Sequence, residues 1–346
     1  MAAAVQPAPR EEGWTRVLLA TAAFLLLARA PGAQALLPIV DTFFLLLPLL
    51  TACFVAGWAA GGPPSLAIAW FLLTAVLFAV PATAGSAPYQ GVTRAWGLLV
   101  AAAFALLCVF GARGTLLRRG LYACAFALAW AVFGTFMLAT GPVALERIFA
   151  AEFAARNAAT TAMFARWLPA VSARFAGAGD WATARSAELA QASSAVAAPL
   201  VPALLVLEAL AACALAWALY HRLSRARLGP PLTALRAFTF GHAPVWALIA
   251  GGALLILPTS RTVGFIGANV VVVCAALFAV RGAAVAAWFL PIRRTASQVA
   301  AWAVALVLSP VSVPAAFGVG LVDSWLDWRG LARARQAPAS PAPNLK

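Results

Sequence analysis

The chain alternates between long apolar runs and short polar interruptions rich in glycine and proline. Runs such as residues 268–280 (ANVVVVCAALFAV) are continuously apolar and lack the two-residue alternation of membrane β-strands. At about 20 residues per crossing, the pattern predicts an all-α fold, a polytopic membrane helical bundle with about eight to nine transmembrane segments. The expected apolar segments are residues 17–28, 39–58, 65–80, 95–110, 122–138, 199–220, 243–257, 264–290 and 299–322.

A more polar stretch, residues 143–198, interrupts these runs and predicts an extramembrane segment. Apolar residues recur there at three- and four-residue steps (Leu145, Phe149 and Phe153; then Phe164, Trp167, Val171 and Phe175), which is typical of amphipathic helices. We expect them to lie on the membrane surface. The predicted organisation is a membrane half (1–142), the external segment (143–198), a second membrane half (199–322) and a polar, proline-rich tail (323–346) expected to be disordered.

Composition strengthens the membrane assignment. The chain is 64% hydrophobic and 10% charged, with a mean hydropathy of +0.93, whereas soluble domains are about one quarter charged. The net charge of +14 does not indicate nucleic-acid binding, because the arginines stand in short stretches between apolar segments. The expected partners are the lipid bilayer, anionic lipid headgroups and other membrane proteins, with no nucleic acid.

The arginine-rich stretches also predict an orientation. Arginines concentrate after residues 110, 220 and 290, and the positive-inside rule assigns these loops to the cytoplasm. The N-terminus is then inside and residues 143–198 are outside. However, nine simple crossings place Arg329, Arg333 and Arg335 outside, against the rule. Two explanations stay open: a re-entrant last segment broken at Pro310 and Pro314, or a miscount among the early segments.

The sequence offers no catalytic constellation. Its two histidines, His221 and His242, stand beside membrane ends, and its five cysteines fall inside apolar runs without a metal-ligand spacing. No phosphate-binding glycine loop and no hydrolase or metalloprotease motif is present. We therefore predict a protein that is not an enzyme, with no catalytic residue, cofactor or metal site.

Two charged residues inside apolar segments are the candidate intramembrane polar site. A charge within a span costs several kcal/mol and marks a functional candidate. Glu208 lies in PALLVLEALAACALAW, and Arg281 of residues 264–290 is its natural partner by sign. Arg281 is expected about 10 Å deeper than Glu208, so the alternative is a protonated Glu208 that hydrogen-bonds a neighbouring helix.

The last apolar segment ends in GLVDSWLDWRG. Asp323 and Asp327 stand four residues apart and are expected on one helix face, with Trp325 at the membrane interface and Arg329 directly after. The structural interpretation of these residues is a helix end that is capped and that its aromatic side chain anchors at the membrane interface.

This ending resembles the YybS-like family of predicted bacterial inner-membrane proteins (domain of unknown function family 2232), which has no established activity. The matching residues are Gly320, Leu321, Asp323, Trp325, Asp327 and Arg329, with Phe238, Phe240 and Trp246 upstream and the stretch Arg281–Val285. The resemblance covers about the C-terminal half. It implies a multi-pass protein of the bacterial inner membrane, and a functional or packing role for Arg281.

Three functions compete on this basis. The first is a non-catalytic small-molecule transport or substrate-binding component, similar to the substrate-capture subunits of energy-coupling transporters; helices broken by proline and glycine favour it. The alternative is a membrane scaffold that binds partners or anionic lipid through its external helix and basic loops. A lipid-modifying enzyme is third, because acids, histidines and nucleophiles are scarce near the interfaces.

Overall fold

The computed structural model describes residues 39–81, 87–111, 114–137, 147–155, 178–257, 260–290 and 308–336, with the isolated positions 21, 158, 162, 297, 301, 304 and 305. Within these residues the chain forms helices and no strand. By length and composition, four helices could cross a membrane, and four shorter apolar helices accompany them. The all-α, membrane-helical class is therefore confirmed, while the number of crossings stays a prediction.

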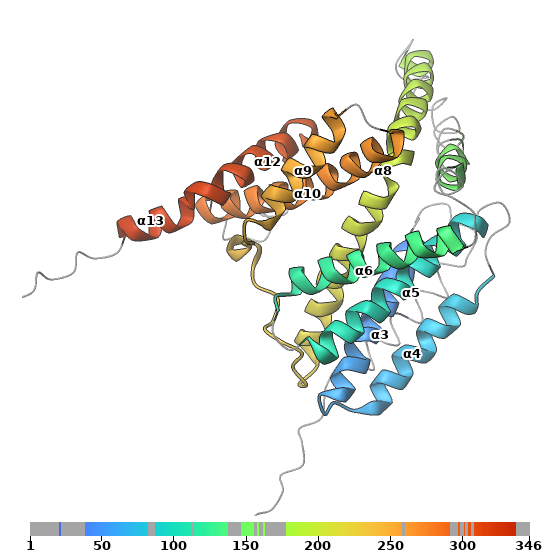
Figure 1. The fold of residues 1–346 in the computed structure, drawn as a ribbon, viewed down its shortest axis with the longest axis vertical. Helices are drawn as coiled ribbons and strands as arrows, with labels where there is room; N and C mark the ends of the chain where they lie inside the picture. Colours follow the sequence, from blue (N-terminus) through green and yellow to red (C-terminus); the bar gives the residue numbers. More distant parts are fainter. Residues whose placement is uncertain are drawn as a thin grey trace, which may run out of the picture. The chain divides into compact units, whose positions relative to one another are not determined.

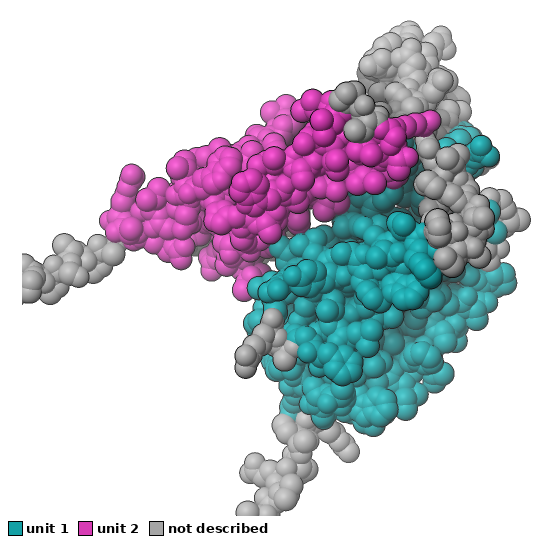
Figure 2. Space-filling view, in the orientation of Figure 1, with its two compact units in different colours: residues 1–232 teal, residues 233–346 magenta. Residues whose placement is uncertain are grey.

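The chain divides into two compact units, residues 1–232 and 233–346 (Figure 2). Unit 1 contains five long helices, labelled in Figure 1. They are α3 (Ile39–Ala59), α4 (Pro64–Ala79), α5 (Ala87–Phe110), α6 (Leu116–Met137) and α8 (Ala178–Leu223). Residues 147–155 are also helical.

Helices α3 and α4 form a hairpin whose turn the sequence dictates. Gly61 adopts a positive φ of 90°, which favours glycine, and Pro64 begins α4, where its missing N–H leaves no helical bond unmade. Across the hairpin, the buried Thr51 hydroxyl lies 2.8 Å from the Thr74 hydroxyl and donates to the Trp70 carbonyl at 3.0 Å. These bonds satisfy polar groups that lipid could not.

Aromatic side chains join α8 to the helices around it. The Phe54 ring of α3 stacks on Trp70 of α4 at 5.6 Å and meets Tyr220 of α8 edge-on at 5.2 Å. Trp217 of α8 makes an edge contact with Phe104 of α5, with centroids 6.2 Å apart. Trp70, Phe104, Trp217 and Tyr220 are almost completely buried, so the core of unit 1 lies between α3, α4, α5 and α8.

The polar segment predicted at residues 143–198 is described in part, at residues 147–155, 158, 162 and 178–198. Its described ends are both helical, and residues 178–198 form the first part of α8. This helix is 46 residues long and continues into the segment predicted as the sixth span. The amphipathic surface helix therefore stays a prediction, as does the first apolar segment, residues 17–28, of which only Thr21 is described.

The described residues of unit 2 form a short helical turn and four helices. They are η1 (Leu235–Ala237), α9 (Ala243–Ile256), α10 (Arg261–Phe289), α12 (Ser309–Leu326) and α13 (Trp328–Gln336). Helices α9 and α10 form an antiparallel hairpin in which Gly251 packs against Val270 and Gly267 against Leu254. The tail expected to be disordered from Asp323 onwards is helical as far as Gln336, because α12 includes Asp323 and α13 follows it.

Helices α10 and α12 lie side by side and run in the same direction (Figure 1). Gly282 of α10 lies beside Gly320 of α12, so both helices end beyond this crossing on the same side. At about 1.5 Å per residue, α12 begins about 16 Å before the crossing and α10 about 32 Å before it. Helix α12 is thus too short to accompany α10 along its whole length.

Candidate functional site

Small residues bring the backbones of α10 and α12 into contact. A Cβ atom on Gly282 would overlap the carbonyl oxygen of Ala316, and one on Gly320 would overlap that of Phe278. Close approach through small residues four apart is a common way for helices to associate in lipid, where the hydrophobic effect does not drive them together. This crossing sets the distance between Arg281, which precedes Gly282, and Asp323, which is three residues after Gly320.

Arg281, Asp323 and Arg329 form a buried charged cluster, called the arginine–aspartate cluster below. The Asp323 Oδ2 atom accepts a hydrogen bond from Arg281 Nε at 2.9 Å and another from Arg329 Nη2 at 2.9 Å. Arg281 Nη2 also donates to the Asp323 main-chain carbonyl at 2.9 Å. Asp323 is 0% exposed, so these bonds stabilise a carboxylate that burial would otherwise disfavour.

The same two guanidinium groups hold the segment before α9, residues 236–240. Arg281 Nη1 donates to the carbonyl of Phe240 at 3.0 Å, and Arg329 Nη1 donates to those of Phe238 and Arg236 at 3.0 and 3.2 Å. Arg236 lies within the short helical turn η1, and Phe238 and Phe240 follow it in non-helical backbone. The cluster therefore connects three parts of unit 2: α10, the α12–α13 junction and residues 236–240.

Aromatic rings cover the cluster on the side of this segment. The Arg281 guanidinium lies over the Phe240 ring, 5.2 Å from its centroid. Phe240 in turn meets Phe278 at 5.3 Å, and Phe278 meets Phe317 at 6.3 Å. Guanidinium groups stack favourably on aromatic faces, and the contact strengthens where water is excluded.

The cluster holds one carboxylate against two guanidinium groups and therefore carries an excess positive charge. Asp323 Oδ1 is buried and accepts no hydrogen bond from any described atom. Arg281 uses all three of its guanidinium nitrogens in the contacts above. Such an arrangement fixes three chain segments; it offers no exposed nucleophile or proton donor.

The other predicted site residues lie elsewhere. Asp323, rather than Glu208 as predicted, is the carboxylate that the structure assigns to Arg281. Glu208 lies half-exposed on α8 in unit 1. Asp327 does not share a helix face with Asp323, because α12 ends at Leu326 and Asp327 adopts a left-handed conformation with φ 40°. Its Oδ1 instead accepts the Gly330 N–H at 3.2 Å, and Trp325 is 65% exposed.

Unit 1 contains a buried arginine, Arg119, which the sequence did not single out as a candidate site residue. It is 4% exposed and lies over the Trp217 ring at 5.3 Å. Its Nη1 donates to the Leu228 carbonyl at 3.0 Å and its Nη2 to the Gly111 carbonyl at 3.2 Å. Among the described residues its partners include no carboxylate. Because Arg119 stands in the arginine-rich stretch after residue 110, the sequence pattern marked it only as a loop cation.

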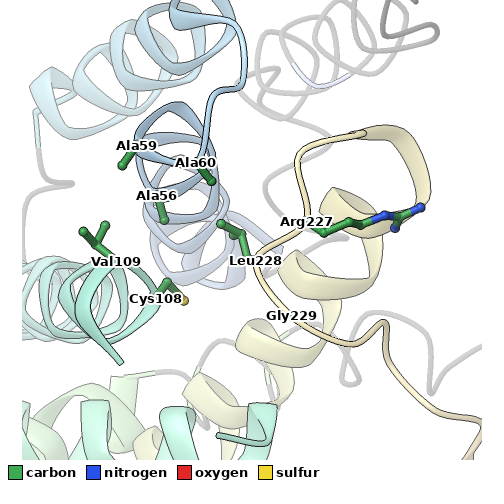
Figure 3. Close-up of a pocket in the computed structure, with 8 residues that line it drawn as sticks. All are labelled: Ala56, Ala59, Ala60, Cys108, Val109, Arg227, Leu228 and Gly229. Carbon is green, nitrogen blue, oxygen red and sulfur yellow. The ribbon is translucent and has the colours of Figure 1, made fainter. Parts of the chain in front are cut away.

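A cavity of about 370 Å³ lies beside this arginine, within unit 1. Its wall consists of the ends of α3 and α5 and the loop after α8 (Figure 3). The lining residues are Ala56, Ala59, Ala60, Cys108, Val109, Arg227, Leu228 and Gly229. The Arg227 side chain points away from α3 and α5 in Figure 3, and its Nη1 donates to the His221 carbonyl at 2.7 Å. Of the lining residues, only Cys108 and Arg227 carry a polar side chain.

Arg119 and Trp217 hold the loop that closes this cavity. Arg119 binds the Leu228 carbonyl, and Trp217 Nε1 donates to the Pro230 carbonyl at 3.0 Å. Gly229 lies between them, and a Cβ atom there would stand 3.2 Å from the Trp217 ring. Groups that could hold a metal ion, three or more His, Cys, Asp or Glu together, do not occur among the described residues.

Comparison with known proteins supports the resemblance read from the sequence. Residues 174–324 match the family described as "Predicted membrane protein (DUF2232)". The match includes Arg281, Gly282, Gly320 and Asp323, so the helix crossing and two members of the arginine–aspartate cluster lie within it. No curated protein and no solved structure matches the chain.

Proposed function

Since residues 174–324 match this family of predicted membrane proteins, we propose that the chain is a non-catalytic membrane component that binds or transports a small molecule. The observation that carries the proposal is the cavity at the ends of α3 and α5. Its volume of about 370 Å³ falls near the lower end of the range of small-molecule sites, about 300–1,000 Å³. We place the protein in the bacterial inner membrane, with its N-terminus in the cytoplasm.

The shape of the cavity follows from side chains of little volume. Three alanines at the end of α3 and Gly229 in the closing loop leave space that larger residues would fill. The loop is held by hydrogen bonds to its main-chain carbonyls from Arg119 and Trp217. A loop fastened by a few such bonds can open at modest cost, which supports a role in admitting and releasing a ligand.

The chemistry of the lining residues favours binding over catalysis. Their titratable groups are the Cys108 thiol and the Arg227 guanidinium, and the latter points away from α3 and α5 (Figure 3). The Cys108 sulfur lies 3.9 Å from Arg119 Nη1. A nucleophile needs a neighbouring base, and an arginine cannot accept a proton at physiological pH.

The proposal is tested by filling the cavity. We expect the wild-type protein, purified in mild detergent and extracted with solvent, to release a small molecule that mass spectrometry detects at near-stoichiometric amounts. The variant Ala60→Trp, which fills the cavity, should release at least tenfold less. The control Ala125→Trp makes the same substitution at an exposed position of α6 and should retain the wild-type amount. Equal retention by both variants, or release of bulk lipid alone by the wild type, contradicts the proposal.

The alternative of a membrane scaffold has a separate test. It predicts that deleting residues 143–198 removes co-purifying proteins. It makes no prediction about a small molecule in the cavity. The basic C-terminal helix α13 favours an interaction role for this end of the chain.

A further inference from the structure

Exposed arginines and exposed apolar side chains gather at the end of unit 2 formed by α13 and residues 236–240. Arg236, Arg333 and Arg335 are exposed, and none forms an ion pair with a described residue. The apolar members, Trp325, Leu326 and Leu331, are exposed by 65%, 52% and 52%. Mixed basic and apolar exposure of this kind is typical of helices that lie in the membrane interface.

Two contacts hold these groups on neighbouring elements. The Asp327 carboxylate caps the first turn of α13 by accepting the Gly330 N–H, so the helix restarts directly after the left-handed residue. Arg329 then binds the carbonyls of Arg236 and Phe238. Arg329 is thus a buried positioning residue. The Arg236, Arg333 and Arg335 side chains are exposed, and Arg333 Nε donates to the Arg329 carbonyl at 3.2 Å.

The direction of the helices assigns this end of unit 2 to a side of the membrane. Because α10 and α12 run in the same direction, α13 follows α12 at the same end at which α10 finishes. In the sequence, Arg293 and Arg294 follow α10 directly. Arg236, Arg333 and Arg335 therefore lie at the end of unit 2 at which α10 finishes, and the arginine-rich sequence that follows α10 assigns this end to the cytoplasm by the positive-inside rule.

We propose that α13 and Arg236 bind the headgroups of anionic phospholipids in the cytoplasmic leaflet. The three exposed arginines contact the phosphates, while Trp325, Leu326 and Leu331 enter the interfacial region of the bilayer. The cytoplasmic leaflet carries the negative surface potential that attracts juxtamembrane arginines, which gives the required charge complementarity. The proposal is independent of the cavity in unit 1, so either can fail alone.

The test measures lipid retention by the intact protein. Wild-type protein in a neutral detergent is titrated with phosphatidylglycerol or phosphatidylcholine, and bound lipid is counted by native mass spectrometry. We expect a preference for phosphatidylglycerol that falls by about tenfold or more in the double variant Arg333→Ala/Arg335→Ala. The matched control Arg147→Ala/Arg261→Ala removes two exposed arginines from segments predicted to lie outside, and should keep the preference.

Each further outcome decides the proposal. Equal losses in both double variants would show a general effect of net charge and overturn it, as would equal binding of the two lipids by the wild type. Displacement of the lipid by inorganic phosphate at millimolar concentration would show an ion site rather than a membrane-docking surface. The variant Leu331→Ser keeps every charge and is expected to weaken phosphatidylglycerol binding; unchanged binding would remove the apolar contact from the proposal. Unchanged melting temperatures exclude unfolding as the cause.

Discussion

Gly320 of α12 faces Gly282 of α10 so closely that a Cβ atom on Gly320 would stand 2.7 Å from the Gly282 backbone nitrogen. It would also overlap the Phe278 carbonyl oxygen. Neither obstacle can move without shifting a whole helix, because both belong to the backbone. The closeness of α10 and α12 therefore depends on these two positions having no side chain.

We expect Gly320→Ala to force the two helices apart and to destabilise the protein by about 1–3 kcal/mol. Separation would also lengthen the contacts of Arg281 with Asp323. The control is Gly318→Ala on the same helix, where a Cβ atom would meet nothing within 4 Å and where alanine improves helix propensity. Thermal unfolding in detergent compares them. A melting temperature of Gly320→Ala at or above that of the control would contradict the packing described here.

The arginine–aspartate cluster gives the largest expected effect. Asp323→Asn removes the one negative charge and leaves two buried guanidinium groups without a carboxylate. Breaking a buried ion pair by removing one partner costs about 3–5 kcal/mol. We therefore expect a large fall in the melting temperature or failure to accumulate in the membrane. Asp327→Asn, at an exposed position four residues later, should change stability by about 1 kcal/mol or less, since it weakens only a cap.

The conservative variant Arg281→Lys separates charge from geometry. Lysine keeps the positive charge but cannot place three separate donors on Asp323 and the Phe240 carbonyl, as the guanidinium does. We expect its melting temperature to fall between those of the wild type and Asp323→Asn. Hydrogen exchange should also increase in residues 236–240, which the guanidinium holds. Wild-type protection of that segment would show that charge alone fixes it.

The sequence predicted where the helices lie better than it predicted which of them pack against one another, for a physical reason. Apolar periodicity marks which residues can lie in lipid, so α5, α9 and α10 end within a few residues of the expected positions. It does not say which helices pack together. Glu208 and Arg281 were paired by sign, against their expected difference in depth, whereas the close approach at Gly282 and Gly320 selects Asp323 as the partner.

The resemblance carried information that periodicity lacked. Phe238, Phe240, Arg281, Asp323 and Arg329 are far apart in the sequence, yet they form one cluster in unit 2. Their common appearance in a family pattern was the signal that could have predicted this cluster. The Arg119 contacts had no such signal, because they depend on main-chain carbonyls, which any sequence provides.

Arg119 is expected to control the loop that closes the cavity. Arg119→Met removes the donors to the Leu228 and Gly111 carbonyls while keeping the length of the side chain. Hydrogen exchange should then rise in residues 226–232, together with faster release of any ligand held in the cavity. Arg118→Met is the matched control, since Arg118 is an exposed neighbour whose Nε donates to the Tyr122 hydroxyl. The same increase in both variants would show a general loosening of α6 rather than release of the loop.

The common direction of α10 and α12 predicts the sidedness that the arginine counts left open. A single outward crossing by the last segment would put the end of α12 opposite the end of α10, whereas the structure puts both ends on one side. We therefore expect a cysteine introduced by Arg335→Cys to be labelled from the same side of the membrane as one introduced by Leu290→Cys, at the end of α10. Ser260→Cys, before the start of α10, should be labelled from the other side.

The five native cysteines are buried and can be replaced by alanine to remove background. Intact cells are treated with a maleimide that cannot cross the membrane. Labelling of Ser260→Cys but not of Arg335→Cys or Leu290→Cys would support a last segment that enters the membrane from the cytoplasmic side and returns to it. Access to Arg335→Cys together with Ser260→Cys would show instead that the chain ends outside, and the lipid-docking surface on α13 would then face the wrong leaflet.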